Sequence, residues 1–346
     1  MGRRRCIGAN AAVMRGEFPR GYSPGMLALW KRSLLLVLAG ALFFGAIGLV
    51  AVWAPDLPLD DLKVRWARPP SRFIEVNGQQ VHVRDEGPHD DPAPIVLLHG
   101  TSASLHTWQG WAEGLREHRR VIRVDLPGFG LTGPSPDGRY GIERYVSFVI
   151  ALLDKLQVQR AVIAGNSLGG YVAWKTAADH PDRITTLILI DAAGYAFESQ
   201  SVPIAFRLAS NPLTAPLLQR LSSRRTVESS VRNVYGDPSK VTPEVVDRYY
   251  ELALREGNRA AIAARFAQVQ PGEHAAQVAT IRQPTLILWG AKDRLIPPEN
   301  AERFHRDIAG SQLVVFDGLG HVPQEEDPAI TVAAVTSFLA SHDDAR

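Results

Sequence analysis

The sequence predicts an α/β protein in which a mostly parallel sheet carries helices on both faces. Three observations support this fold class. Short apolar runs alternate with helical patterns through most of the chain, which is the order of elements in a parallel sheet. A Gly-x-Ser-x-Gly segment at 165–169 lies between the apolar run 161–164 and a helical stretch at 171–179. The 346 residues suffice for one such domain with a substantial core.

Composition excludes several classes of protein. Hydrophobic residues make up 45% and charged residues 21%, which is ordinary for a globular protein. The net charge of +2 does not suggest a nucleic-acid partner, and Cys6 is the single cysteine, so no intrachain disulfide can form. We find no cysteine or histidine cluster with metal spacing and no glycine pattern of a nucleotide-binding fold. We therefore expect no cofactor and no metal.

An uncharged apolar run at 34–54 is long enough to cross a bilayer as a helix, so we expect a transmembrane anchor there. Lys31 and Arg32 stand directly before it. A cleavable signal peptide is one alternative, but its apolar core would be shorter, and Pro55 after Ala54 would hinder cleavage. A buried core helix is the other alternative.

Flanking charges predict the orientation of this anchor. Basic residues dominate the predicted tail at 1–33, which favours a cytoplasmic N-terminus and a periplasmic or otherwise extracytoplasmic C-terminal domain on a single-pass protein. Met14 and Met26 are alternative starts, and a start at Met26 would narrow this asymmetry. The proline-rich segment 55–71 predicts a stalk, and the folded α/β domain is expected at 72–346.

The domain opens with strand patterns. Residues 73–76 and 80–84 flank Asn77-Gly78, which is a strong signal for a β-hairpin. Further apolar runs at 95–98 and 121–124 predict the first central strands.

Ser167 is the candidate nucleophile. A strand, a Gly-x-Ser-x-Gly turn and a helix in succession form a nucleophile elbow, in which a sharp turn exposes the serine hydroxyl near a helix N-terminus. The alternative is an ordinary glycine-rich turn with an N-cap serine.

A serine nucleophile needs a base, and the base needs an orienting acid. The strand pattern 284–289 leads into a turn that presents Asp293, and the strand pattern 312–316 precedes a loop that carries His321. Both groups are expected at the edge of the sheet where Ser167 lies. Asp191 follows another predicted strand and is the second choice for the acid.

Backbone N–H groups of Thr101 and Leu168 are the candidate oxyanion hole, since the first follows the strand 95–98 and the second follows the nucleophile. His99 precedes a glycine turn, and we interpret it as a structural histidine rather than a base. Asp125 is expected to organise its own loop.

Strand and helix alternation stops between about 195 and 282, where broken helical patterns predict a cap over the sheet. Its large apolar side chains either line a substrate pocket, contact lipid, or pack the cap against the core: Tyr195, Phe197, Ile204, Phe206, Leu208, Leu213, Leu217 and Leu218.

Taken together, the motifs at His99-Gly100, 125–130, 165–170, 290–293 and Gly320-His321 resemble the α/β-hydrolase superfamily over about residues 70–340. The chain is most similar to serine esterases and lipases of the monoacylglycerol-lipase and bacterial family V type. This resemblance implies an eight-stranded α/β-hydrolase fold with Ser167 as nucleophile, His321 as base and Asp293 as its partner. A serine at 167 argues against dehalogenase and epoxide hydrolase chemistry, which use an aspartate there.

Three functions remain open. The first is a membrane-anchored serine hydrolase acting on a small-molecule ester or lipid, such as short or medium acyl esters or monoacylglycerols. The second is another reaction of the same triad: C–C bond hydrolysis, amide hydrolysis or cofactor-free perhydrolysis. The third is a non-catalytic receptor that keeps the fold and binds a ligand.

Overall fold

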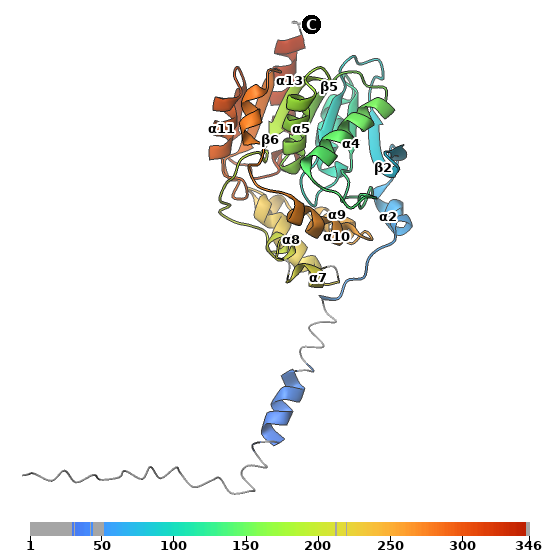
Figure 1. Cartoon of the computed structure of the whole chain (residues 1–346), viewed down its shortest axis with the longest axis vertical. Helices are drawn as coiled ribbons and strands as arrows, with labels where there is room; N and C mark the ends of the chain where they lie inside the picture. Colours follow the sequence, from blue (N-terminus) through green and yellow to red (C-terminus); the bar gives the residue numbers. More distant parts are fainter. Residues whose placement is uncertain are drawn as a thin grey trace, which may run out of the picture. The chain divides into compact units, whose positions relative to one another are not determined.

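A computed structural model describes most of the chain (Figure 1). The residues that it describes are 30, 32–41, 43, 52–211, 213–218 and 220–343. The chain divides into two units, residues 1–51 and 52–346. All strands and the candidate site lie in the second unit.

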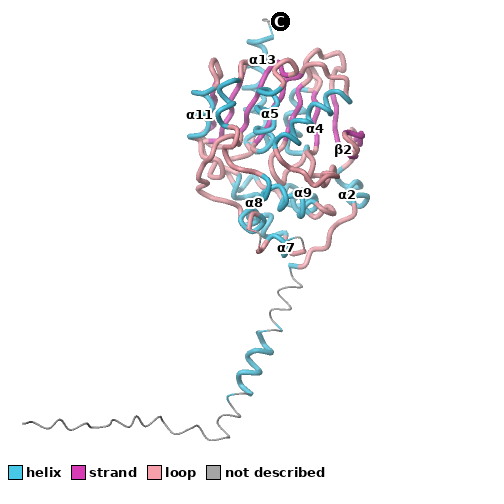
Figure 2. Tube along the Cα trace, viewed as in Figure 1, coloured by secondary structure: helices cyan, strands magenta, loops and turns pink. Residues whose placement is uncertain are grey.

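One sheet of 8 strands forms the centre of the second unit (Figure 2). The spatial order is β1-β2-β4-β3-β5-β6-β7-β8. The strands are β1 (Arg72–Val76), β2 (Gln79–Glu86), β3 (Ile95–Leu98), β4 (Val121–Val124), β5 (Ala161–Asn166), β6 (Ile184–Ile190), β7 (Thr285–Gly290) and β8 (Gln312–Phe316). β2 is antiparallel to both neighbours, and the other neighbours pair in parallel. The predicted mostly parallel eight-stranded sheet is confirmed.

The predicted hairpin joins β1 to β2. Asn77 and Gly78 both have positive φ angles, 49° and 76°, which a two-residue turn of this kind requires.

The central strands alternate between two apolar cores. In β3, Val96 and Leu98 belong to one core, and Ile95 and Leu97 belong to the other. The first core includes side chains of α4 (Ile142–Lys155), α5 (Leu168–Asp179) and α11 (Glu299–Asp307), and the second those of α3 (Gln109–Leu115) and α13 (Pro328–Asp343). Strands buried on both faces read as continuous apolar runs, which is why they could be found from the sequence.

Short helices between β6 and β7 form the cap, grouped at one end of the sheet (Figure 2). They are α6 (Ile204–Ala209), α7 (Ala215–Leu218), α8 (Arg224–Val234), α9 (Pro243–Ala253) and α10 (Asn258–Gln268). Single helical turns complete the fold: η1 (Leu105–Trp108), η2 (Pro238–Lys240), η3 (Ala275–Thr280) and α12 (Pro323–Glu326).

The structure differs from the expected stalk. Residues 59–66 form helix α2 (Leu59–Trp66), and its Leu62 and Trp66 are buried against Leu131 and Leu252 of the domain. The Trp66 indole N–H also donates to Glu251 at 2.7 Å. These partners are distant in the sequence, so the local pattern of prolines and charges did not reveal the packing.

Residues 52–57, which we call the strap, pair with the cap. The Ala54 N–H donates to the Arg220 carbonyl (3.0 Å), and the Ser222 N–H donates to the Val52 carbonyl (2.9 Å). Leu57 pairs in the same way with the end of α9, where its N–H donates to the Leu254 carbonyl at 2.7 Å.

The predicted transmembrane helix at 34–54 is corrected by the structure. Among the described residues, none of the helices has the length and apolar character needed to cross a membrane. Helix is described at 32–41, whereas Trp53 and Ala54 at the end of the predicted span are paired with the cap. Most of the predicted basic tail, including Cys6, lies outside the described residues.

Candidate active site

Ser167 lies in a sharp turn between β5 and α5. Its φ and ψ are 55° and −115°, a left-handed conformation that a residue with a side chain rarely adopts. Backbone hydrogen bonds hold it there: its N–H donates to the Ile190 carbonyl (3.1 Å), and its carbonyl accepts from Ala193 (3.0 Å) and Tyr171 (3.1 Å). The surrounding structure therefore fixes the position of this hydroxyl.

Two glycines allow the turn to be this tight. A Cβ added to Gly165 would lie 2.1 Å from the Gly169 carbonyl oxygen, and one added to Gly169 would lie 2.0 Å from the Leu98 carbonyl oxygen. Side chains at these positions would push α5 away from the sheet, so the glycines of the motif are required by close packing.

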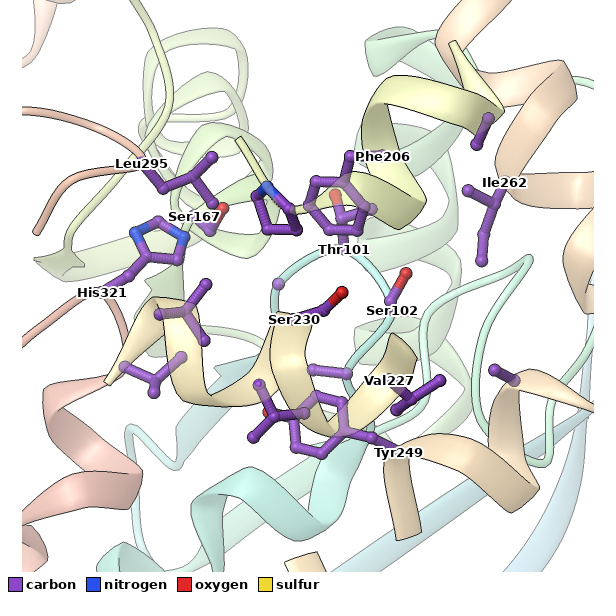
Figure 3. A pocket seen from close by; sticks show the side chains of 18 of the residues that line it. Thr101, Ser102, Ser167, Phe206, Val227, Ser230, Tyr249, Ile262, Leu295 and His321 are labelled. Atoms are coloured by element: carbon purple, nitrogen blue, oxygen red, sulfur yellow. The ribbon is translucent and has the colours of Figure 1, made fainter. Parts of the chain in front are cut away.

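His321 and Asp293 lie together after β8 and β7. His321 Nδ1 is 2.7 Å from Asp293 Oδ2, and both side chains are buried. Asp293 Oδ1 accepts two backbone N–H groups, from Leu295 (2.8 Å) and Ile296 (3.0 Å). Because Nδ1 is engaged with the carboxylate, Nε2 is the ring nitrogen left for a substrate or a nucleophile. His321 and Ser167 lie at one end of the same pocket (Figure 3).

The backbone around His321 is tied to the elbow and to the cap. Asn166 Nδ2 donates to the carbonyl of His321 (2.8 Å), and the His321 N–H donates to the Val234 carbonyl at the end of α8 (2.7 Å). The Glu326 carboxylate accepts N–H groups from both segments, Gly320 at 2.9 Å and Gly236 at 2.9 Å.

The candidate oxyanion donors lie at the same place. Leu168 is the first residue of α5, so its N–H has no acceptor within the helix. Thr101 follows β3 and lines the same pocket as Ser167 (Figure 3). The next residue, Ser102, has a φ of 62°, which marks a sharply turned loop.

The structure places His99 and Asp125 away from the chemistry. His99 is fully buried, its Nδ1 is 2.7 Å from the Gly100 carbonyl, and its Nε2 accepts the Leu126 N–H at 3.0 Å. Burial lowers the pKa of His99, so it is neutral and shapes this loop. Asp125 accepts the N–H groups of Leu105 (2.7 Å) and Leu131 (2.8 Å) and organises two loops.

Asp191, the second choice for the acid, also reaches this site. It follows β6 and is fully buried, and a carboxyl oxygen of Asp191, one of Asp293 and a ring nitrogen of His321 lie within 4.8 Å of one another. Of these two acids, Asp293 is the one that is hydrogen-bonded to His321.

A largely apolar pocket opens from Ser167 beneath the cap (Figure 3). Its walls combine the loop after β3 with side chains of the cap helices. The apolar side chains of the wall include Phe206, Leu221, Val227, Val231, Val234, Ile262, Leu295 and Val322. Of the cap residues predicted as possible lining, Phe206 lies in this wall. Tyr195 instead donates its hydroxyl to Asp307 (2.8 Å), and the side chains of Leu217 and Leu218 are not described.

Sequence reasoning missed three residues around this pocket. Arg259 lines it, and its Nη2 donates to Asp56 (2.7 Å) and to the Ala54 carbonyl (2.8 Å) of the strap. Asn166 and Glu326 join segments that are far apart in the chain. Asn166 lies inside the recognised motif, which is a signal for its importance, but the roles of Arg259 and Glu326 depend on tertiary contacts alone.

Comparison with known proteins agrees with this fold. The family model described as alpha/beta hydrolase fold matches residues 93–328. A 2-hydroxy-6-oxo-2,4-heptadienoate hydrolase of Pseudomonas putida is 31% identical over 288 residues, covering 79% of this chain and 97% of the relative. The solved structure of a membrane phospholipase A is 25% identical, with a TM-score of 0.68, covering 92% of this chain and 98% of that one. A meta-cleavage product hydrolase from Pseudomonas fluorescens, 24% identical over 78% of this chain and 97% of that one with a TM-score of 0.68, shares the fold.

Proposed function

Because this chain belongs to the α/β-hydrolase family, we propose that it is a serine hydrolase that cleaves carboxylic esters with an apolar acyl or alcohol part. The observation that carries this proposal is the apolar pocket that begins at Ser167 and runs beneath the cap. An apolar wall favours an uncharged, hydrophobic substrate, because a buried charge without a partner costs several kcal/mol or more.

In the proposed reaction, Ser167 Oγ attacks the ester carbonyl while His321 Nε2 takes the hydroxyl proton. The tetrahedral oxyanion accepts hydrogen bonds from the N–H groups of Thr101 and Leu168. The C–O bond breaks and the alcohol leaves with the proton from His321. Water then attacks the acyl-enzyme in the same way and releases the acid and the free serine.

Asp293 orients the base. Its 2.7 Å contact with Nδ1 keeps the proton on that nitrogen, so that Nε2 presents a lone pair to Ser167. The two backbone N–H groups on its other oxygen stabilise the carboxylate. A left-handed serine and an oriented histidine also favour catalysis over the alternative of a ligand-binding receptor, which needs neither.

Hydrolysis of a C–C bond is the second candidate, and two observations favour it. The relative at 31% identity is named for a dienoate, which carries a carboxylate. Arg259 lines the pocket, and its buried Nε and Nη1 have no hydrogen-bond partner among the described residues. A substrate carboxylate is a suitable acceptor for these donors. The same side chain is also paired with Asp56, which offsets part of its charge. The named relatives support C–C hydrolysis more than ester hydrolysis, whereas the apolar pocket wall is what supports the ester.

One experiment separates the two candidates. We would measure kcat/KM for p-nitrophenyl esters of increasing acyl length and for a 2-hydroxy-6-oxo-dienoate, using wild type and Ser167→Ala. We expect kcat/KM for the esters to rise from acetate to a medium chain as the apolar pocket fills, by up to about tenfold for each two buried methylene groups.

The opposite ranking would defeat the ester proposal. If the dienoate is cleaved at least about a hundred times more efficiently than every ester, the chain is a C–C hydrolase. Arg259→Met is the matched variant, because it should reduce cleavage of the dienoate but leave p-nitrophenyl ester hydrolysis within a fewfold of wild type. Full activity of Ser167→Ala on both substrates would exclude the serine mechanism altogether.

A further inference from the structure

Two carboxyl groups, and not one, lie beside the imidazole of His321. Asp293 follows β7 and Asp191 follows β6, and the two strands are neighbours in the sheet. Both acids are buried, and their nearest oxygens lie within 4.8 Å of each other and of a His321 ring nitrogen. The simple triad uses one of these acids and leaves the other unexplained.

Their hydrogen bonds distinguish the two acids. Asp293 receives three donors: two backbone N–H groups on Oδ1 and His321 on Oδ2. Asp191 receives one donor, the Gly290 N–H on Oδ1 at 3.1 Å, and its buried Oδ2 has no partner among the described residues. An ionised carboxylate is stabilised by donors, so Asp293 is the better site for the negative charge.

Burial and charge point the same way. The charged groups that face Asp191 are Asp293, Glu326 and, when protonated, His321. Burial raises the pKa of Asp191 well above its ordinary value, and the neighbouring Asp293 carboxylate raises it further. Two buried carboxyl groups this close favour sharing one negative charge, and Asp293 has more donors to stabilise it, so the proton of the pair lies on Asp191. Asp293 has a carboxyl oxygen within 4.8 Å of an Asp191 carboxyl oxygen and can accept this proton in a hydrogen bond.

We infer that Asp191 is a positioning residue of the catalytic site, a neutral acid whose O–H donates to Asp293 and which replaces Asp293 as partner of His321 when that carboxylate is removed. This inference rests on the proposed serine mechanism. In the native enzyme, the shared proton holds Asp293 in place. When Asp293 becomes asparagine, Asp191 no longer faces a second carboxylate, so it can ionise and accept the Nδ1–H.

A double-mutant cycle tests this inference, using the full chain and p-nitrophenyl butyrate. Asp191→Asn keeps an acceptor for Gly290 but replaces the O–H donor to Asp293 by a weaker N–H donor, so we expect kcat/KM to fall about fivefold below wild type. Asp293→Asn should lose on the order of a hundredfold. The variant Asp191→Asn/Asp293→Asn should lose about ten-thousand-fold, the loss typical of a triad without its acid.

The pH dependence of ester hydrolysis distinguishes this role from a purely structural one. Residual activity of Asp293→Asn should rise with pH as Asp191 loses its proton, and the double variant should lack this rise. Addition of Ser167→Ala to Asp293→Asn should abolish the residual rate, which shows that it comes from the same serine. Urea unfolding identifies any variant that does not fold, and Asp191→Ser then replaces Asp191→Asn in the cycle.

Equal activity of Asp293→Asn and the double variant would overturn the inference, because Asp191 would then contribute nothing as a substitute. The inference would also be overturned if the loss of kcat/KM in the double variant equalled the product of the losses in the two single variants. Failure of the proposed function looks different: wild type would not hydrolyse the ester, or Ser167→Ala would retain its rate.

Discussion

At Ser167 a residue with a side chain adopts a backbone conformation suited to glycine. Such strain costs about 1–3 kcal/mol and persists only where the surroundings impose it. Here the helix α5, the strand β5 and the backbone bonds to Ile190 and Ala193 impose it. The surroundings thus hold the hydroxyl at the pocket, and the strained conformation lowers the stability of the fold.

Two substitutions at this residue separate strain from chemistry. Ser167→Gly and Ser167→Ala should both lower kcat about a million-fold, because each removes the nucleophile. Glycine also relieves the strain of the left-handed backbone, so the free energy of unfolding of Ser167→Gly should exceed that of Ser167→Ala by about 1 kcal/mol. Ser167→Gly should therefore unfold at a higher urea concentration. Equal stabilities would show that the turn is not strained.

A second prediction concerns the packing at Gly169. Gly169→Ala would place its Cβ against the Leu98 carbonyl, so we expect a loss of several kcal/mol in the free energy of unfolding, or failure to fold. Gly318→Ala is the matched control, because no atom lies within 4 Å of its added Cβ. Urea titrations of the two purified proteins compare them. Similar midpoints would contradict the close approach of α5 to β3.

At the scale of elements, the strap and α2 join the N-terminal part of the second unit to the cap. The strap supplies backbone partners to Arg220, Ser222 and Leu254, and its Ala54 carbonyl and Asp56 hold Arg259 of the pocket wall. The strap is therefore part of the support of the substrate pocket, although the sequence suggested only a stalk.

Truncation tests this support. A protein that begins at Val52 should keep the ester activity, whereas one that begins at Leu59 should lose stability by a few kcal/mol, because several backbone hydrogen bonds worth about 1 kcal/mol each are removed. We expect its kcat/KM for a medium-chain ester to fall at least severalfold while that for acetate changes less. Thermal unfolding and ester kinetics measure the two effects. If the two truncated proteins had the same stability and the same ester kinetics, the strap would not support the pocket.

The same comparison shows what the sequence could predict. Strands β3 and β5 to β7 were predictable because strands buried on both faces form continuous apolar runs. The edge strand β8 is partly exposed, but its run 313–316 is also apolar. The positions of Ser167, Asp293 and His321 were predictable because each follows such a strand. The packing of α2 was not, since Trp66 and Leu252 meet only in the folded chain. The predicted membrane helix was wrong for a related reason: hydropathy does not register that Trp53 and Ala54 pair with the cap.

At the scale of the whole molecule, the half-buried His106 makes the stability dependent on pH. His106 joins η1 to α2, since its Nε2 donates to the Trp66 carbonyl at 2.9 Å. Burial, partly offset by Asp125, lowers the pKa of His106 to about 3. An exposed histidine in the unfolded chain titrates near ~6.5. Between these values the unfolded state binds more protons than the folded state, so stability rises with pH in this window.

The free energy of unfolding should therefore be greatest above about pH 6.5 and should fall on acidification toward about pH 4, with a contribution from His106 of a few kcal/mol. His106→Gln removes the titration but keeps an N–H donor, so its unfolding should depend less on pH in this window. Exposed His118→Gln is the control and should follow wild type. If the free energy of unfolding depended on pH in the same way for wild type and His106→Gln, His106 would not be the source of this pH dependence.

The bonds between His321 and the cap have a consequence for turnover. The Val234 carbonyl at the end of α8 holds the His321 N–H, and Glu326 holds Gly236 and Gly320 together. Lifting α8 away from the sheet at this end would pull on the loop that carries the base. In the proposed mechanism, raising the cap at this end would therefore move His321 out of line with Ser167, so that water entering the open site would meet a serine without an aligned base.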